Sequence, residues 1–389
     1  MPELLLEAAK TESAAAPQKP HRRLLQKGIC ALCAALAVTT LSLYGWHAAE
    51  EVLADGVANA ALEHLLPYSL SALPITLSPV DPTLQPTPPL PRIYYIPREV
   101  IADRAYAEKA ALEQKIFDLY AFPESDVPRD AHPIRPSDLS TDNATALQND
   151  TEYAVNMEAI AKAADLRAPE SIAGEPLVLI VHTHGTEGFS ADGSTFYSEE
   201  YNVPRTEDVS QNVVAVGKHL AETLNKKGIP TLHCETMHDK ESYIAAYDRS
   251  AESIRTYLER YPSIRYVFDV HRDSLIRSDL TKLRPVTLHQ GEPTAQIMMI
   301  IGSGEKSGID YDWQANLILA EAIQKRLVAD TLGVARQLYL RGATYNQQYA
   351  AYGLLLEIGA CGNSLAEAKN AATAFADAFA KVIKASAER

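Results

Sequence analysis

Residues 178–189 read VLIVHTHGTEGF, an apolar run that passes directly into a polar cluster. The same change occurs in VFDVHRDS at 267–274 and in LLLEIGACGN at 354–363. Apolar runs of this length are typical of strands buried in a parallel sheet, and ligands of open α/β sheets bind beyond the carboxyl ends of the strands. The three stretches therefore predict an α/β fold with one site where these strands end.

From about residue 175 onward, apolar runs alternate with amphipathic stretches of helix length. This alternation predicts one domain over 175–387, with a central, largely parallel or mixed sheet covered by helices. We expect strands at Leu177–Thr183, Ile229–Glu235, Ile264–Val270, Ala295–Ile301 and Gly353–Ile358. We expect helices at Asp208–Lys227, Ser242–Arg260, Asp312–Val328 and Leu365–Lys384, the last with a capping box of Ser364 and Glu367.

His184, His271 and Glu357 are the chemically distinctive residues of the three stretches. Zinc takes neutral imidazole nitrogen and carboxylate oxygen as ligands, and a catalytic zinc keeps a further position for a water whose pKa falls to about 7. Two histidines and a carboxylate therefore indicate a zinc site. Glu357 suits the separate role of proton shuttle, because an apolar strand would raise the pKa of its carboxyl toward the operating pH.

Each histidine also has a simpler interpretation, since a histidine at a strand end is often a hydrogen-bonded residue of the core or its rim. His182 and His184 share one face of the strand by the two-residue period. Gly185 would let the backbone turn after His184 and place it at the lip of the site. We therefore favour His184 over His182 as a ligand.

Asp269 and Asp273 flank the second histidine. A carboxylate bonded to a ligand imidazole is the usual arrangement at metal sites, so either could orient His271. Either could instead pair with Arg272 and be structural. The remaining histidines of this half of the chain look like ordinary helix, strand-end or hairpin residues, namely His219, His233, His238 and His289.

Residues 28–46 carry no charge, and as a helix this stretch would span a hydrocarbon core of roughly 30 Å. Arg22, Arg23 and Lys27 precede it and acidic residues follow, so the positive-inside rule leaves 1–27 in the cytoplasm as a tail. We therefore expect a single-pass protein of the cell membrane with its catalytic domain outside the cytoplasm. A cleaved signal peptide is the rival interpretation.

Residues 47–174 would connect this anchor to the domain. Residues 49–66 resemble a short amphipathic helix, and Pro67–Pro97 reads as an extended, proline-rich spacer. Residues 98–120 have a helical composition. Residues 121–152 are rich in Pro, Asp, Ser, Thr and Asn, which favours loop or disorder.

The 389-residue chain has a formal net charge of −14, and 47% of its residues are hydrophobic. Such a chain can bury a sizeable core. Binding to nucleic acid needs a basic face that neutralises phosphates, so we expect no nucleic-acid partner. Cys234 and Cys361 are compatible either with two buried thiols or with one bridge.

Residues 176–380 resemble the stage II sporulation protein P family. The resemblance rests on short motifs that occur in order: HTHGTEGF, RTED followed by NVVAVGKHL, HDKESY, DVHRDS, YNQ at 345–347, and LLEIGACGN. Any one of these strings is weak evidence. Their order and spacing across the whole range make the resemblance specific.

The resemblance implies a fold similar to that of zinc N-acetylmuramoyl-L-alanine amidases, which hydrolyse the amide between the lactyl group of the glycan and the stem peptide. It implies that His184 and His271 are zinc ligands and that Glu357 is the catalytic glutamate. The third ligand of those amidases maps near Asp208. Glu187 lies closer to His184, within the first motif, and we favour it over Asp208.

By the same resemblance, Arg205, Asn346 and Asn363 would contact substrate or shape the site. The family acts in sporulation engulfment with a lytic transglycosylase and a membrane scaffold, so we expect peptidoglycan as substrate and these proteins as partners. Two other functions stay open. One is a zinc peptidoglycan endopeptidase that cleaves peptide cross-links, an activity also attributed to the family, and the other is a catalytically degenerate wall-binding scaffold.

Overall fold

The computed structural model describes residues 98–172, 174–198 and 205–384 of the chain. The described residues belong to one compact unit. The predicted anchor at 28–46 and the proline-rich spacer lie outside the described residues, so both stay predictions. Within the described ranges, no helix is both long enough and apolar enough to cross a bilayer.

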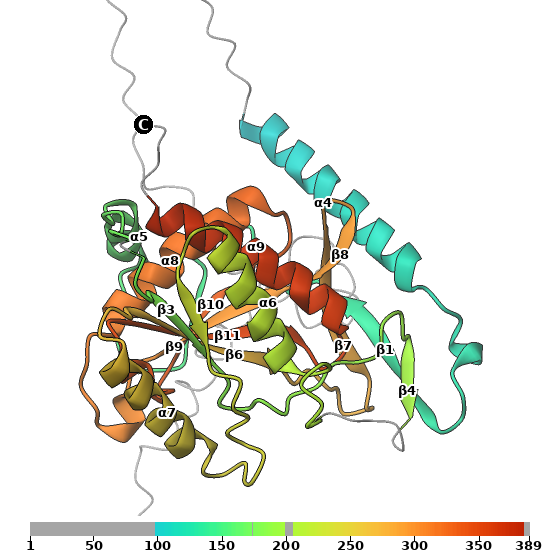
Figure 1. The fold of residues 1–389 in the computed structure, drawn as a ribbon. Coiled ribbons are helices and arrows are strands. Elements are labelled where there is room, and N and C mark those ends of the chain that lie inside the picture. The colour runs from blue at the N-terminus through green and yellow to red at the C-terminus, as the bar shows by residue number, and fades with distance from the viewer. Residues whose placement is uncertain (1–97, 173, 199–204, 385–389) are drawn as a thin grey trace, which may run out of the picture. The chain divides into compact units, whose positions relative to one another are not determined.

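A mixed seven-stranded sheet forms the centre of this unit (Figure 1). Its strands lie in the order β2 (Leu147–Asn149), β10 (Leu338–Arg341), β9 (Ile297–Gly302), β11 (Tyr352–Ala360), β6 (Tyr266–Asp273), β3 (Val178–Val181) and β5 (Thr231–His233). The last four strands are parallel to one another, and β9 runs antiparallel to β11. The predicted α/β fold with a mixed sheet is confirmed, and all five predicted strands belong to this sheet.

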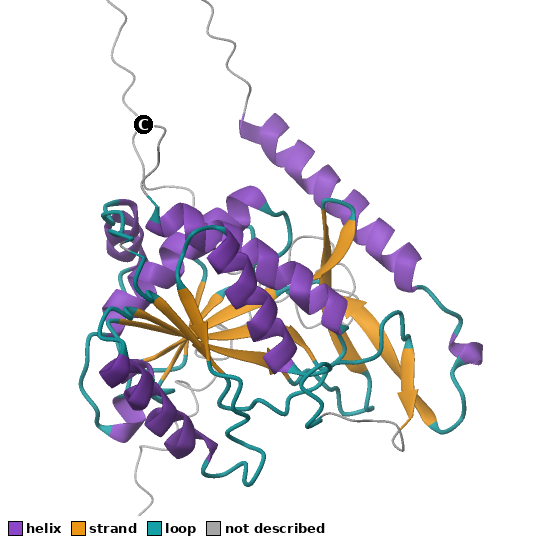
Figure 2. Cartoon of the chain, in the orientation of Figure 1, coloured by secondary structure: helices purple, strands orange, loops and turns teal. Residues whose placement is uncertain are grey.

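Helices cover both faces of the sheet (Figures 1 and 2). On one face lie α6 (Val213–Lys226), α8 (Trp313–Asp330) and α9 (Leu365–Ile383), with α9 in contact with both of the others. Their buried side chains form the main hydrophobic core with the strands. On the other face, Ile254 of α7 (Ala246–Arg260) packs against Leu179, Val181 and Val267.

Alternation along β6 determines which face carries polar residues. Tyr266, Phe268 and Val270 are buried in the main core under α6, α8 and α9, whereas Val267 packs with α7. Side chains of a strand point alternately to its two faces. Asp269 and His271 therefore lie on the same face as Val267, away from the main core.

A second, four-stranded sheet has the order β4 (Phe196–Ser198), β1 (Ala131–Ser137), β7 (Lys282–His289) and β8 (Glu292–Ala295). Gln290 and Gly291 join β7 to β8 with φ angles of 54° and 87°. Two positive φ angles are what a two-residue type I′ hairpin requires. His289 thus ends the first strand of a hairpin, as the sequence predicted.

The prediction of loop or disorder over 121–152 is wrong for part of that range. β1 pairs with β4 and β7, and β2 pairs with β10. All three partners lie far along the chain, so long-range pairing rather than local propensity determines these short strands. The remaining elements are α4 (Arg98–Tyr120), η3 (Glu124–Asp126), α5 (Met157–Asp165), η4 (Glu305–Ser307) and η5 (Gln347–Tyr349).

Two predicted helices begin later than expected, α6 at Val213 and α7 at Ala246. Asn212 caps α6, because its side chain accepts a hydrogen bond from the backbone of Val214 at 3.0 Å. The predicted capping box of α9 is present. Cys234 and Cys361 are both buried free thiols, which excludes the bridge between them.

Truncation tests where the folded unit begins. A chain that starts at residue 175 lacks α4 and β1, and with them the buried side chains of Ile116 and Ile134. Losing the burial of these two side chains costs about 3–6 kcal/mol. We expect the fragment 175–389 to melt at a lower temperature than the fragment 94–389, as measured by circular dichroism. Equal melting temperatures would instead support the boundary at 175.

Glu321 of α8 is buried, and neither of its carboxylate oxygens has a hydrogen-bond partner. Burial raises the pKa of this carboxyl to about 7, although the nearby charge of Lys325 opposes the shift. The folded-state pKa therefore lies above the ordinary value of 4.5. The contribution of Glu321 to stability is fully present below about pH 4.5 and is lost as the pH rises through about 7.

Replacing Glu321 with Gln removes this titration. The Glu321→Gln variant should gain melting temperature over the wild type at about pH 8.5 and gain much less at about pH 4.5. Glu252, an exposed residue of α7, supplies the control variant Glu252→Gln, whose effect should not depend on pH in this way. A difference for Glu321→Gln that is the same at both pH values would contradict the argument.

Candidate active site

The central sheet brings the three strand-end residues together. Glu357 of β11 lies opposite His271 of β6 in the parallel register, and β6 also pairs with β3, after which His184 follows. The rings of His184 and His271 meet edge on, with centroids 5.3 Å apart. Adjacent parallel strands have their carboxyl ends at the same end of the sheet, so residues far apart in the sequence lie close together there.

Glu187 lies in the turn after β3, where its backbone N–H donates to the carbonyl of His184 at 3.1 Å. Its Oε2 atom accepts from the backbone N–H of Arg272 at 3.0 Å and lies 3.5 Å from Nδ1 of His271. Burial alone would raise the pKa of Glu187, but the hydrogen bond and charge of His271 outweigh it and lower the pKa. A charged Glu187 therefore lies beside His271.

Gly185 is needed for a different reason from the predicted one. Its φ is not positive, so the turn itself does not depend on glycine. A Cβ atom at this position would lie only 2.7 Å from the Cα and Cγ atoms of Met237. The missing side chain thus lets the segment around Met237 pack closely against the turn that carries His184.

Asp269 holds His271 from the side opposite Glu187. Its Oδ1 atom lies 3.0 Å from Nε2 of His271, and its two oxygens accept from the backbone and hydroxyl of Thr183 at 2.8 and 2.6 Å. Burial would raise the pKa of Asp269, but the charge of His271 brings it down to about 2. Burial would lower the pKa of His271, but Asp269 and Glu187 raise it well above its ordinary value. With no metal bound, His271 is a cation between two carboxylates.

Further polar contacts extend from Asp269 to the turn before η5. The hydroxyl of Thr183 lies 2.8 Å from that of Ser250, which accepts from the amide of Asn346 at 2.9 Å. The same amide nitrogen donates to the carbonyl of Tyr247 at 2.7 Å. Asn346 is buried with a φ of 58°. It therefore shapes the site through α7 and does not present its N–H groups to a substrate.

His184 is buried against aromatic residues. Its ring stacks on that of Tyr243 with centroids 4.3 Å apart and meets Tyr247 edge on at 5.5 Å. Burial and the neighbouring His271 lower the pKa of His184 to about 4, so its imidazole is neutral at pH 7. Its Nδ1 atom has no hydrogen-bond partner. A neutral imidazole with a free nitrogen is the form that binds metals.

Arg205 borders the site at its open side. Its guanidinium pairs with Asp239, donates to the hydroxyl of Thr186 at 3.1 Å, and lies 3.8 Å from Oε1 of Glu187. It also lies over the ring of Tyr243, 4.7 Å from the centroid. Asp239 was not among the site residues predicted from the sequence, although it belongs to the HDKESY motif. That motif was the available signal.

Glu357 combines a free oxygen with a raised pKa. It is partly buried, and its Oε2 atom has no hydrogen-bond partner. Burial, together with the charges of Glu187 and Asp273, raises its pKa to about 8. Asp273 itself pairs with Arg336 at 2.9 Å rather than with either neighbour considered from the sequence. Glu357 can therefore hold a proton near neutral pH.

Three sequence candidates lie outside this cluster. Asp208 is exposed, and its oxygens accept hydrogen bonds from Ser210 and Gln211 in a local turn. Asn363 is buried, and its amide bonds to backbone atoms and to Glu367 at the start of α9. His182, the less favoured histidine, bonds to the carbonyl of Val270 and to His233. The structure thus brings Glu187, and not Asp208, to the two histidines.

The donor types of the cluster suit zinc, which takes imidazole nitrogen and carboxylate oxygen. Nδ1 of His184 has no partner, and Nδ1 of His271 lies beside the carboxylate of Glu187. Within the described part of the chain, no group of three or more His, Cys, Asp or Glu side chains is placed so that it could hold a metal ion as it stands. These three residues would have to move closer together to bind one.

The fold and the site define an α/β domain that gathers two histidines and two glutamates at one edge of its central sheet. Residues 109–380 match the family Stage II sporulation protein P (SpoIIP), and the chain belongs to this family, as its motifs predicted. The Stage II sporulation protein P of Bacillus subtilis (strain 168) is 26% identical over 226 residues, which cover 55% of this chain and 53% of that protein. The chain thus matches about half the length of this relative.

Several solved structures are distantly similar. The CwlD amidase from Clostridioides difficile, in complex with the GerS lipoprotein, is 13% identical with a TM-score of 0.34, over 53% of this chain and 96% of that chain. N-acetylmuramoyl-L-alanine amidase AmiC2 of Nostoc punctiforme is 13% identical with a TM-score of 0.30, over 54% and 96%. Cwp6 from Clostridium difficile is 14% identical with a TM-score of 0.33, over 55% and 30%. Similarity at this level carries no argument about activity.

The charge of Asp269 should control the titration of His271. In the Asp269→Asn variant, without added metal, the pKa of His271 should fall toward or below its ordinary value, because burial then outweighs the one remaining carboxylate. Nuclear magnetic resonance titration of the histidine ring protons measures this shift. Asp273→Asn is the matched control, since Asp273 pairs with Arg336. An unchanged His271 pKa in Asp269→Asn would show that Asp269 does not hold the imidazolium.

Proposed function

We propose that this protein is a peptidoglycan hydrolase that cleaves the amide between N-acetylmuramic acid and the L-Ala of the stem peptide during sporulation engulfment. One observation carries the proposal: His184, His271, Glu187 and Glu357 lie together at one edge of the sheet in a member of the SpoIIP family. A neutral imidazole, a carboxylate-held imidazole and a glutamate with a raised pKa are the components that hydrolysis of an amide needs.

We propose that zinc binds to His184, His271 and Glu187. Bound there, zinc would polarise the scissile carbonyl and lower the pKa of a water. Metal binding requires unprotonated imidazoles, so His271 would release its proton, whereas His184 is already neutral. Asp269 would keep the His271 ring in position, as carboxylates behind ligand histidines do.

Glu357 would move the proton. Its free Oε2 atom takes a proton from the attacking water as the new C–O bond forms. The same atom then gives that proton to the amine nitrogen as the C–N bond breaks, so the carboxylate is regenerated. A pKa of about 8 leaves both protonation states accessible near neutral pH, which suits a group that acts first as base and then as acid.

Arg205 and Tyr243 would meet the substrate. The Arg205 side chain is 39% exposed and Tyr243 is 58% exposed, although both contact the buried cluster. A guanidinium presents paired N–H donors that match a carboxylate. These two residues therefore suit a stem peptide, which carries carboxylate groups.

The proposed setting follows from the sequence. The segment 28–46 would anchor the protein in the cell membrane with 1–27 in the cytoplasm, and the proline-rich spacer would carry the domain toward the wall. A lytic transglycosylase would act on the glycan from which stem peptides have been removed. We propose that enzyme and a membrane scaffold of the engulfment machinery as partners.

Glu357→Gln separates proton transfer from metal binding. The variant should keep the zinc content of the wild type and lose activity on purified peptidoglycan by on the order of 100-fold or more, because the amide cannot accept the proton. Mass spectrometry of the digest measures released stem peptides, and atomic absorption measures zinc. The double variant His184→Ala, His271→Ala should lose both. Undiminished hydrolysis by Glu357→Gln would contradict the role of this residue.

The products also distinguish the possible functions. Zinc-dependent release of free stem peptides by the wild-type full chain would establish an amidase. Cleaved cross-links on peptides that stay attached to glycan would make it an endopeptidase. No products from a chain that binds peptidoglycan in a sedimentation assay would favour the scaffold.

A further inference from the structure

A basic cleft lies near the amino ends of the parallel strands, whereas the candidate active site lies at their carboxyl ends. The end of α5 with residues 166–169, the second half of α8 and the last turn of α9 form it. Arg167 of the cleft donates to the hydroxyl of Tyr266, the first residue of β6, at 3.0 Å. At about 3.3 Å per residue, Tyr266 and His271 are roughly 17 Å apart along this strand. The cleft is therefore distinct from the active site.

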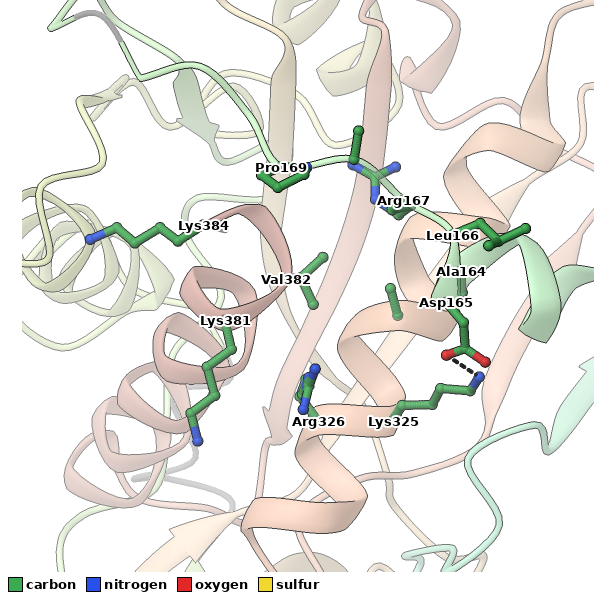
Figure 3. A pocket seen from close by; sticks show the side chains of 12 residues that line it. Ala164, Asp165, Leu166, Arg167, Pro169, Lys325, Arg326, Lys381, Val382 and Lys384 are labelled. Atoms are coloured by element: carbon green, nitrogen blue, oxygen red, sulfur yellow. Dashed lines mark hydrogen bonds and ion pairs between the residues drawn. The ribbon is translucent and has the colours of Figure 1, made fainter. Parts of the chain in front are cut away.

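The cleft concentrates positive charge in an acidic chain (Figure 3). Five cationic side chains and one carboxylate line it, whereas the formal net charge of the whole chain is −14. The cationic residues are Arg167, Lys325, Arg326, Lys381 and Lys384, and the carboxylate is Asp165. This local excess attracts anions.

The three lysines already have protein partners. Lys325 pairs with Asp165 at 2.8 Å, Lys381 pairs with Asp330 at 3.0 Å, and Lys384 donates to a backbone carbonyl. Cationic residues near the end of a helix also complement the partial negative charge of its last carbonyls. The lysines can therefore be explained without a ligand.

The two arginines differ from the lysines. Among the residues that the structure describes, none forms a hydrogen bond or ion pair with the guanidinium of Arg326. Arg167 is fixed by Tyr266 and by the ring of Tyr352, whose centroid lies 4.6 Å from it, yet its Nε atom is buried without a hydrogen-bond partner. An unsatisfied buried N–H group is costly, so this guanidinium keeps donor capacity that the protein itself does not use. In Figure 3 Arg167 lies on the loop above the cleft and Arg326 on the helix below it, whereas Lys384 extends away.

The size and lining of the cleft indicate a small oxyanion. Its volume is about 590 Å³, within the range of about 300–1,000 Å³ that is typical of small-molecule sites. Small apolar residues form its walls, including Ala164, Ala168, Ala322 and Val382. Guanidinium groups match phosphate oxygens with paired N–H donors. An acidic protein would need a broader contact than this concave cleft provides.

We propose that this cleft binds a phosphate group between Arg167 and Arg326. Arg167 provides a fixed donor, and Arg326 provides a charge that no carboxylate of the described chain neutralises. Free phosphate and the phosphodiester of a lipid headgroup share this chemistry. The proposal does not depend on the hydrolytic function, since the cleft shares no residue with the active site.

Isothermal titration calorimetry on the full chain in a nonionic detergent tests the proposal. The probes are inorganic phosphate and glycerophosphoglycerol, the headgroup of phosphatidylglycerol. We expect saturable binding at one site, weakened about tenfold or more in Arg326→Gln because a charge-assisted hydrogen bond is lost, and partly restored in Arg326→Lys. Tighter binding of inorganic phosphate would indicate a free phosphate as the ligand, and tighter binding of glycerophosphoglycerol would indicate a headgroup.

Arg129→Gln is the matched control, because Arg129 is exposed and lies outside the cleft. This variant should bind both probes as the wild type does. The proposal is overturned if neither probe binds saturably, or if Arg129→Gln loses as much affinity as Arg326→Gln. It is also overturned if hexaglutamate binds while neither phosphate probe does, since the cleft would then recognise an acidic peptide. Arg326 is exposed on α8, so melting temperatures of its variants should equal that of the wild type.

Discussion

The parallel pairing of β6 between β3 and β11 is the constraint on which the candidate site depends. The register places Asp269 opposite Val181 and Glu357 opposite His271. A slip of one residue in β6 would turn every side chain to the other face of the sheet. His271 would then point into the apolar core under α9. The burial of Tyr266, Phe268 and Val270 therefore fixes the register. Because these apolar side chains point into the core, Asp269 and His271 must point to the opposite face of the sheet.

The apolar face of β6 needs only burial, whereas each charged side chain on its polar face needs a partner of opposite charge. His271 lies between Asp269 and Glu187, so removing either carboxylate would make the protonated form of this buried imidazole costly. Thr183 satisfies both oxygens of Asp269, and contacts through Ser250 connect this group to α7. A buried network in which the members have partners favours one arrangement. Three atoms of the cluster have no hydrogen bond, namely Nδ1 of His184, Nε2 of His271 and Oε2 of Glu357. Nε2 of His271 lies 3.0 Å from Asp269, so the other two atoms are the ones available for chemistry.

Local sequence patterns predicted those parts of the fold that local patterns determine. The five predicted strands of the central sheet are apolar runs, and the capping box of α9 is a short-range signal. β1 and β2 were missed because their pairing partners are distant and their own residues are mostly polar or proline. At the site, His184, His271 and Glu357 followed from strand ends, whereas spacing alone could not decide between Glu187 and Asp208. That choice depends on the turn after β3 and on the backbone of Arg272, which only the folded chain brings together.

The start of β6, like its end, is fixed by polar contacts with neighbouring segments. Glu170, on the segment that leads into β3, accepts from the hydroxyl of Tyr266 at 2.6 Å and pairs with Arg265 at 2.7 Å, while Arg167 contacts Tyr266 from the cleft. The segment entering β3 is thus fastened to the start of β6, and the same pairing positions the site at the other end. An anion bound at Arg167 would add stability to this arrangement by mass action. It would not move His271, because a sheet register changes by whole residues and not by small displacements.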